Sequence, residues 1–288
     1  MTNDKFTQPV IDLIKNRSSW RSYESRSLDA QIRETVLKYL EAQTVGPLGH
    51  KMRFLLIEKS DPAIFDNVRL GTYGFIKNAK NFIVGAITPG EKYWEDYGYL
   101  LEKIILKMTD WELGTCWLGG TFKRSEFGKA INISDNEIIP AITPIGYHTV
   151  KRSLRDGIIR WEAKSHSRKA WESVFFEDDF ESPLNRDALS EYGDVLEMVR
   201  LAPSASNKQP WQIVRQDHHY HFFLKRTTKI SHGNFGDLQR IDMGIAMCHF
   251  ELTARDLGLS GIWEDNRTDL EPPDDIEYCI TWREKSFF

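Results

Sequence analysis

Two stretches of this 288-residue chain repeat each other, residues 96–117 (DYGYLLEKIILKMTDWELGTCW) and residues 242–263 (DMGIAMCHFELTARDLGLSGIW). Both begin with Asp-x-Gly and end in tryptophan, and one offset of 146 residues relates Asp96 to Asp242 and Trp117 to Trp263. Apolar residues recur between these ends with the spacing of one helix face, at Leu100, Leu101, Ile104, Ile105, Met108 and Trp111 and then at Ala246, Met247, Phe250, Ala254 and Leu257. Such self-similarity predicts two related structural units.

A second pair of matching segments lies upstream of the first. Residues 36–41 (VLKYLE) correspond to residues 195–200 (VLEMVR) at an offset of 159, and each segment leads through a loop into an apolar, strand-like run. We therefore predict two helix–loop–strand–helix units in one chain. Chance similarity between amphipathic helices remains the alternative, since such periodicity is common.

The two loops differ in chemistry. Residues 202–211 (APSASNKQPW) carry short polar side chains that bond nearby backbone or a ligand, and Pro203 disfavours continuation of the preceding helix. Residues 44–50 (TVGPLGH) have no comparable Ser/Asn/Gln set. Taken alone, the second loop is either a ligand-binding loop or an ordinary helix-to-strand turn.

Composition limits the class of protein. With 41% hydrophobic and 28% charged residues, the chain has the profile of a globular protein, and a net charge of -4 gives no overall attraction to nucleic acid or anionic membrane. Cys116, Cys248 and Cys279 are too widely spaced for a C-x-x-C metal or redox pair, and no secretory or membrane-spanning pattern is evident. We expect a cytoplasmic protein without membrane or nucleic-acid partners and without a metal site.

Two basic segments are candidate anion sites. In the N-terminal segment Arg17 and Arg21 flank Ser18 and Ser19, a combination suited to binding phosphate, although a solvated turn is the alternative. Lys151 and Arg152 follow the strand-like run 141–147, at the kind of strand end where ligand-binding charges often lie. Residues 156–190, which are basic and then acidic, are interpreted as a connector rather than a core element.

Together these motifs resemble the flavin-dependent nitroreductase family, in its single-chain, duplicated branch. The Arg-x-Ser-x-Arg-x-Tyr run from Arg17 is similar to the family's flavin signature, residues 113–120 to its glycine turn beside the flavin ring, and residues 203–211 to its flavin-covering loop. The resemblance implies an α+β fold with antiparallel-type central sheets surrounded by helices. It also implies FMN-binding residues, namely Arg17, Ser18, Ser19, Arg21, Gly119, Gly120, Lys151, Arg152, Pro203, Ser204, Ala205, Ser206, Asn207 and Gln209.

One departure from the family pattern predicts the domain organisation. Family members are typically dimers that build each flavin site from both subunits, whereas here the arginine signature lies in the first half and the covering loop in the second. We therefore expect an internal pseudo-dimer with one FMN. Its parts are a first unit at residues 1–155, the connector at 156–190, and a shorter second unit at 191–288, and the whole is expected to be a monomer.

The resemblance implies a ping-pong reaction in which NAD(P)H reduces FMN, which then reduces a nitroaromatic, a quinone or a similar small acceptor. The hydride passes through the flavin, so no protein acid–base pair is required and no catalytic side chain is predicted. Two alternatives remain open. The chain could bind flavin without catalysis, as a regulatory protein, or it could have lost flavin and act as a structural module.

Overall fold

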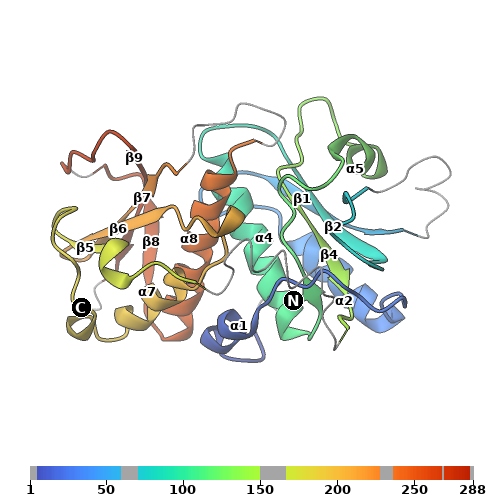
Figure 1. The fold of residues 1–288 in the computed structure, drawn as a ribbon, viewed down its shortest axis with the longest axis horizontal. Helices are drawn as coiled ribbons and strands as arrows, with labels where there is room; N and C mark the ends of the chain where they lie inside the picture. The colour runs from blue at the N-terminus through green and yellow to red at the C-terminus, as the bar shows by residue number, and fades with distance from the viewer. Residues whose placement is uncertain (1–4, 60–70, 150–166, 228–235, 268, 286–288) are drawn as a thin grey trace.

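The protein is described from a computed structural model that covers residues 5–59, 71–149, 167–227, 236–267 and 269–285. Two sheets lie at opposite ends of the molecule, and the long helices α4 and α8 run between them (Figure 1). The α+β class is confirmed. No helix in the described ranges is long and apolar enough to cross a membrane.

The first half holds a sheet in the order β1-β2-β4-β3, whose pairings are all antiparallel. Its elements, in chain order, are α1 (Val10–Asn16), α2 (Ala30–Ala42), β1 (Met52–Glu58), β2 (Asn81–Ile87), α4 (Tyr93–Asp110), β3 (Gly114–Thr115), α5 (Arg124–Ala130) and β4 (Ile142–Gly146). Strand β2 is buried along its whole length, as expected for an apolar central strand covered on both faces.

The second half holds a sheet in the order β5-β6-β7-β9-β8. Its elements are β5 (Phe175–Glu177), α7 (Tyr192–Arg200), β6 (Trp211–Gln216), β7 (His219–Lys225), α8 (Leu238–Asp256), β8 (Gly261–Glu264) and β9 (Ile276–Glu284), with short 3-10 turns at Trp171–Ser173, Arg186–Ala188 and Ala205–Asn207. The pairings are antiparallel except between β5 and β6, which run parallel.

Strand β5 corrects the expectation that residues 156–190 contain no core element. Phe175 pairs with Ile213 of β6, and Val174 and Phe175 are fully buried. The polar residues around them obscured this short apolar run, whose strand β5 lies at the edge of the second sheet. The domain boundaries themselves stay a prediction.

The two units predicted from the repeat are present. Helices α2 and α7 contain the matched segments 36–41 and 195–200, and helices α4 and α8 contain the Asp-x-Gly stretches. Asp96 accepts hydrogen bonds from the backbone amides of Leu48 and His50, at 2.7 and 2.9 Å. Asp242 does the equivalent in the second unit, where it accepts from the Ala205 amide at 2.9 Å. Each aspartate therefore fixes the loop of its own unit.

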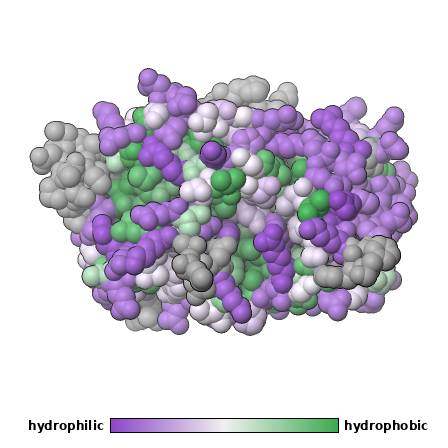
Figure 2. All heavy atoms as spheres, turned by 180° about the vertical axis from the view of Figure 1, so that it is seen from behind, coloured by the Kyte–Doolittle hydropathy of each residue, from purple (hydrophilic) through white to green (hydrophobic). Residues whose placement is uncertain are grey.

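The glycine of each Asp-x-Gly allows the two long helices to touch. A Cβ atom at Gly98 would collide with the carbonyl oxygen of Ile241, and one at Gly244 would collide with that of Glu95. The helices thus meet backbone to backbone, and one cluster of buried apolar side chains continues from α4 through α8 into both halves. From behind, the surface is mostly hydrophilic, with hydrophobic patches mainly over the first half and the middle (Figure 2).

Candidate functional site

The loop that follows α7 has a constrained backbone. Ser206, Asn207 and Gln209 all have positive φ angles, 49°, 55° and 48°, a region that residues other than glycine seldom adopt. The Ala205 amide is bound by Asp242, and the Gln209 amide donates to Ser204 Oγ at 2.8 Å. Burial raises the pKa of Asp242 well above its usual value. Contacts of this kind hold the loop in one shape, as preorganised binding loops require.

Residues 167–169 lie along this loop. The Lys169 amide donates to Gln209 Oε1 at 2.8 Å, Lys169 Nζ donates to the Gln209 carbonyl at 2.9 Å, and Asn207 Nδ2 donates to the Ser167 carbonyl at 3.0 Å. Arg168 Nη1 lies 3.4 Å from Asn207 Oδ1. The buried amide of Gln209 therefore holds the loop against this segment, while Pro203, Ser204 and Ala205 are half-buried.

Two arginines from distant parts of the chain act on each other electrostatically, and one of them, Arg168, lies along the loop. Arg17 follows α1 and has a side chain only 9% exposed. Burial, together with the positive charges of Arg17 and Arg200, lowers the pKa of Arg168 to about 10. Positive charges close to each other in a partly buried position attract an anion. The positive charge of Arg17, in the first half, therefore acts on Arg168, which lies along the second-half loop and which the sequence reasoning missed. That Arg17 binds a ligand together with this loop stays a prediction.

The rest of the arginine signature runs between two elements of the first half. Ser19 forms a β-bridge with Thr115 of β3, and the Lys77 amide donates to the Arg21 carbonyl at 2.8 Å. The ring of Trp20 stacks on His148 with centroids 3.7 Å apart. Ser18, Ser19 and Arg21 are half-buried. The segment is therefore fixed along its backbone on both sides.

The predicted glycine turn lies where the two halves meet. A Cβ atom at Gly119 would come within 2.7 Å of Leu238 Cδ2 at the start of α8, so a side chain there requires the Leu238 side chain to shift. The Gly119 carbonyl accepts from Arg124 Nη2 at 2.6 Å, and Gly120 is half-buried in the same turn. Lys151 and Arg152, the other predicted site residues, lie outside the described residues.

A pocket of about 890 Å³ adjoins this turn. Arg124 connects the two, because its guanidinium bonds the Gly119 carbonyl and also lines the pocket. Trp94 and Gly236 form another part of the wall. The space is of the size that small-molecule pockets have, and one wall is aromatic.

The position equivalent to the glycine turn in the second unit has different chemistry. The offset of 146 that relates the two helices also relates Gly119 to Asp265 and Leu238 to Lys92. Lys92 Nζ forms an ion pair with Asp265 Oδ2 at 2.8 Å. Where the first unit has a bare turn against a leucine, the second has a closed salt bridge.

Comparison with known proteins agrees with this architecture. A family model described as "Putative TM nitroreductase" matches residues 9–254. A crystal structure of a "putative nitroreductase" from Thermotoga maritima is similar with a TM-score of 0.60 and 19% identity, over 97% of this chain and 95% of that one. At that identity the likeness shows the fold. No curated protein matches the sequence.

Smaller solved structures match about half of the chain. A nitroreductase family protein from Clostridium novyi covers 52% of this chain and 91% of its own, with 22% identity and a TM-score of 0.41. A "putative nitroreductase" in complex with FMN from Desulfovibrio desulfuricans covers 52% and 94%, with 19% identity and a TM-score of 0.38. The family model, in contrast, extends over both halves, and on that match the protein belongs to the TM nitroreductase family.

Proposed function

We propose that this protein is an FMN-dependent oxidoreductase that uses NAD(P)H to reduce a nitroaromatic, a quinone or a similar small acceptor. Family membership suggests an oxidoreductase. The observation that carries the FMN proposal is the fixed loop from Pro203 to Gln209 with Arg168 Nη1 3.4 Å from Asn207 Oδ1, where the positive charge of Arg17 also acts on Arg168. Bound FMN would supply hydride transfer, and its phosphate would supply the negative charge that these two arginines attract.

The residues divide by the part of FMN that each would hold. Arg17 and Arg168 would bind the phosphate, with Lys151 and Arg152 assigned to the same role by resemblance and Ser18 and Ser19 as hydroxyl donors. The buried Arg17 Nε makes no hydrogen bond among the described residues, and it lies 3.6 Å from Glu102 Oε1. Arg21 would lie near N1 and O2, where a positive charge favours reduction.

The flavin ring would bind between the halves. Backbone amides at Gly119 and Gly120 can approach it closely because glycine has no side chain in the way. The loop from Pro203 to Gln209 would cover the ribityl chain and the pyrimidine edge from the other half. Its fixed shape lowers the ordering cost of binding.

We further propose one FMN per chain and a monomeric protein. The Lys92–Asp265 ion pair stands at the position related to the glycine turn, and the 44–50 loop there has no Ser/Asn/Gln set. Sedimentation should give a species near 33.5 kDa that carries one FMN. Two flavins for each chain would contradict this part of the proposal.

An absorbance spectrum before and after anaerobic addition of NADPH, repeated with NADH, tests the main proposal. The purified protein should be yellow, should lose its 450 nm band on reduction, and should regain it when p-benzoquinone or nitrobenzene is added. A yellow protein that neither nucleotide bleaches would be a flavin-binding protein without this activity. A colourless protein that does not take up FMN would refute the proposal.

A matched pair of arginine variants tests the site. Arg17→Ala should lose FMN, whereas Arg186→Ala, which removes a half-exposed arginine paired with Asp194, should keep it. Equal FMN content in both variants would place the phosphate elsewhere.

A further inference from the structure

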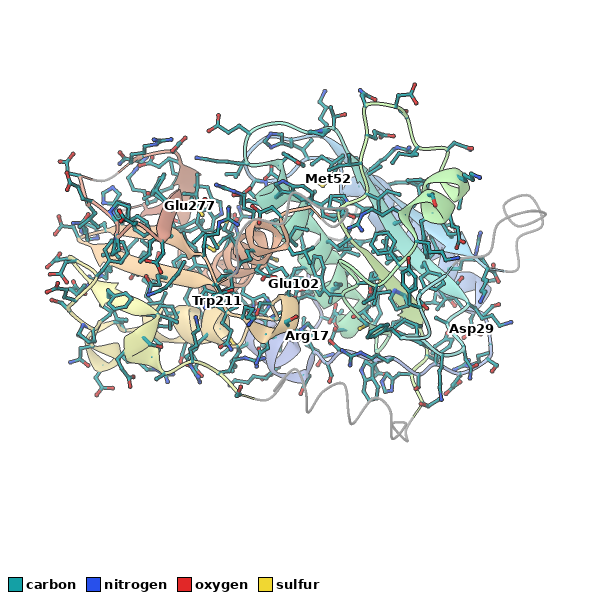
Figure 3. The ribbon with its side chains drawn as sticks, turned by 45° about the horizontal axis from the view of Figure 1, so that its top comes forward. Arg17, Asp29, Met52, Glu102, Trp211 and Glu277 are labelled. Atoms are coloured by element: carbon teal, nitrogen blue, oxygen red, sulfur yellow. The ribbon has the colours of Figure 1, made fainter. Side chains whose placement is uncertain are left out.

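Glu102 is a carboxylate with no solvent exposure at the centre of the molecule, on the face of α4 that meets α8. Its Oε2 accepts a hydrogen bond from Trp117 Nε1 at 2.6 Å. Its Oε1 lies 3.0 Å from His249 Nε2 of α8 and 3.6 Å from Arg17 Nε. Figure 3 shows Glu102 and Arg17 close together between the halves. One buried group therefore contacts the residue that follows α1, helix α8, and the segment between β3 and the glycine turn.

The contacts of His249 show that this carboxylate is fixed in place. His249 Nδ1 lies 2.9 Å from the Met198 carbonyl oxygen, which can only accept, so Nδ1 carries a proton. The other ring nitrogen, Nε2, lies 3.0 Å from Glu102 Oε1. A ring anchored at both nitrogens cannot turn away, and it holds Glu102 from the side of the second half.

The three partners connect Glu102 to both ends of the flavin site. Arg17 is the guanidinium assigned to the phosphate, and Trp117 stands two residues before Gly119 at the ring end. Burial lowers the pKa of Arg168, and the positive charge of Arg17 lowers it further. Glu102 is the carboxylate that the structure pairs with Arg17. If Glu102 lost its negative charge, the buried guanidinium of Arg17 would lose the carboxylate that compensates its own charge, and it would leave its buried position.

We propose that Glu102 is a positioning residue that holds Arg17 in place to bind the FMN phosphate, and that His249 of the second half fixes Glu102 for this purpose. The inference rests on the proposed function. It predicts that an exchange at Glu102 changes recognition of the phosphate specifically, because Glu102 acts on FMN through Arg17.

The test compares FMN with riboflavin, which lacks the phosphate, by quenching of flavin fluorescence on protein freed of bound flavin by dialysis. Glu102→Gln keeps the shape and the acceptor for Trp117 but removes the charge. We expect the Kd for FMN to rise about tenfold and that for riboflavin to change less than about threefold, as for loss of one charged hydrogen-bond partner. In an Arg17→Ala background, Glu102→Gln should no longer change the FMN-to-riboflavin ratio.

Glu95→Gln is the matched control. Glu95 is also a buried carboxylate of α4 that pairs with α8, through Arg240 Nη1 at 2.6 Å, but it does not contact Arg17. Its exchange should destabilise the protein without altering the FMN-to-riboflavin ratio. If Glu102→Gln does not fold, His249→Gln should shift the ratio in the same direction by a smaller factor.

The outcomes separate this inference from the proposed function. If the parent protein binds FMN and riboflavin equally, or neither, the assignment of Arg17 to the phosphate fails. If the parent prefers FMN and Arg17→Ala abolishes that preference, the site stands. In that case the inference would be overturned if Glu102→Gln preferred FMN over riboflavin as strongly as the parent or more strongly. Glu102 would then compete with the FMN phosphate for Arg17 instead of positioning it.

Discussion

Exchange of Gly244 for alanine is the sharpest test of the contact between the two halves. The added Cβ would lie 2.8 Å from both the carbonyl carbon of Glu95 and the backbone nitrogen of Tyr99, and still closer to the Glu95 carbonyl oxygen. Carbon contacts are favourable at about 3.5–4.0 Å. The helices would therefore have to separate by roughly 1 Å, and backbone atoms cannot rotate away as a side chain could.

The expected cost follows from two opposing terms. Overpacking of a close-packed interface costs about 1–3 kcal/mol, and here it falls at the upper end because the obstacle is backbone. Alanine returns up to about 1 kcal/mol through its higher helix propensity. We expect a net loss of about 2 kcal/mol in the free energy of unfolding, which corresponds to a Tm lower by roughly 4–8 °C in a domain of this size.

Urea denaturation followed by circular dichroism measures this loss, and Gly128→Ala in α5 is the control. Gly128 is also a helical glycine, but the nearest atom to its added Cβ is a side-chain carbon of Ile133 at 3.0 Å, which can shift. Gly128→Ala should stay within about 1 kcal/mol of the parent. If Gly244→Ala is as stable as Gly128→Ala, the helices do not meet backbone to backbone and the reasoning about the Asp-x-Gly repeat fails.

Two other predictions concern single side chains. Arg168→Met should weaken FMN binding about tenfold while changing the stability of the flavin-free protein by no more than about 1 kcal/mol. The loss of its contacts with Asn207 Oδ1 and with the Ser167 and Leu201 carbonyls is offset because a buried charge close to Arg17 is removed. A large loss of stability with unchanged FMN affinity would contradict this prediction. Burial and the nearby His219 lower the pKa of His221 to about 4, so the unfolded chain takes up a proton near pH 6.5 that the folded protein refuses. The free energy of unfolding should therefore fall as the pH drops from about 6.5 towards 4. Between pH 7 and 5 the parent should lose about 1–2 kcal/mol more than His221→Gln. If the stability curves of the two proteins are parallel, His221 does not contribute.

The repeat could be predicted from sequence because its Asp-x-Gly pattern makes the same local contacts in both units. Asp96 and Asp242 each bind loop amides of their own unit, and Gly98 and Gly244 each make room for the other helix. Other residues could not easily replace the aspartate or the glycine at these positions, so the Asp-x-Gly motif remains recognisable in both units at a fixed offset. The arginine signature and the covering loop were recognisable for a similar reason, since each is a continuous segment.

Arg168 and the Glu102–His249 pair could not be found in this way. Arg168 sits in a polar stretch with other basic residues, and only the path of the chain places it beside Arg17. The spacing of His249 along α8 does not distinguish it from the apolar residues around it, and its partner Glu102 lies in the other unit. Contacts between distant segments leave no local pattern, so the residues that join the halves had to come from the structure.

The two units of this chain share the residues that build the fold but differ at the positions around the glycine turn. The aspartate and the glycine that build each unit persist in both copies, because the fold needs both. The positions around the glycine turn do not: Gly119 and Leu238 in one copy correspond to Asp265 and Lys92 in the other. Lys92 and Asp265 form an ion pair in which the Lys92 side chain is mostly buried. Under the proposed function only one copy binds a flavin, so the other copy is free to close this position with a salt bridge.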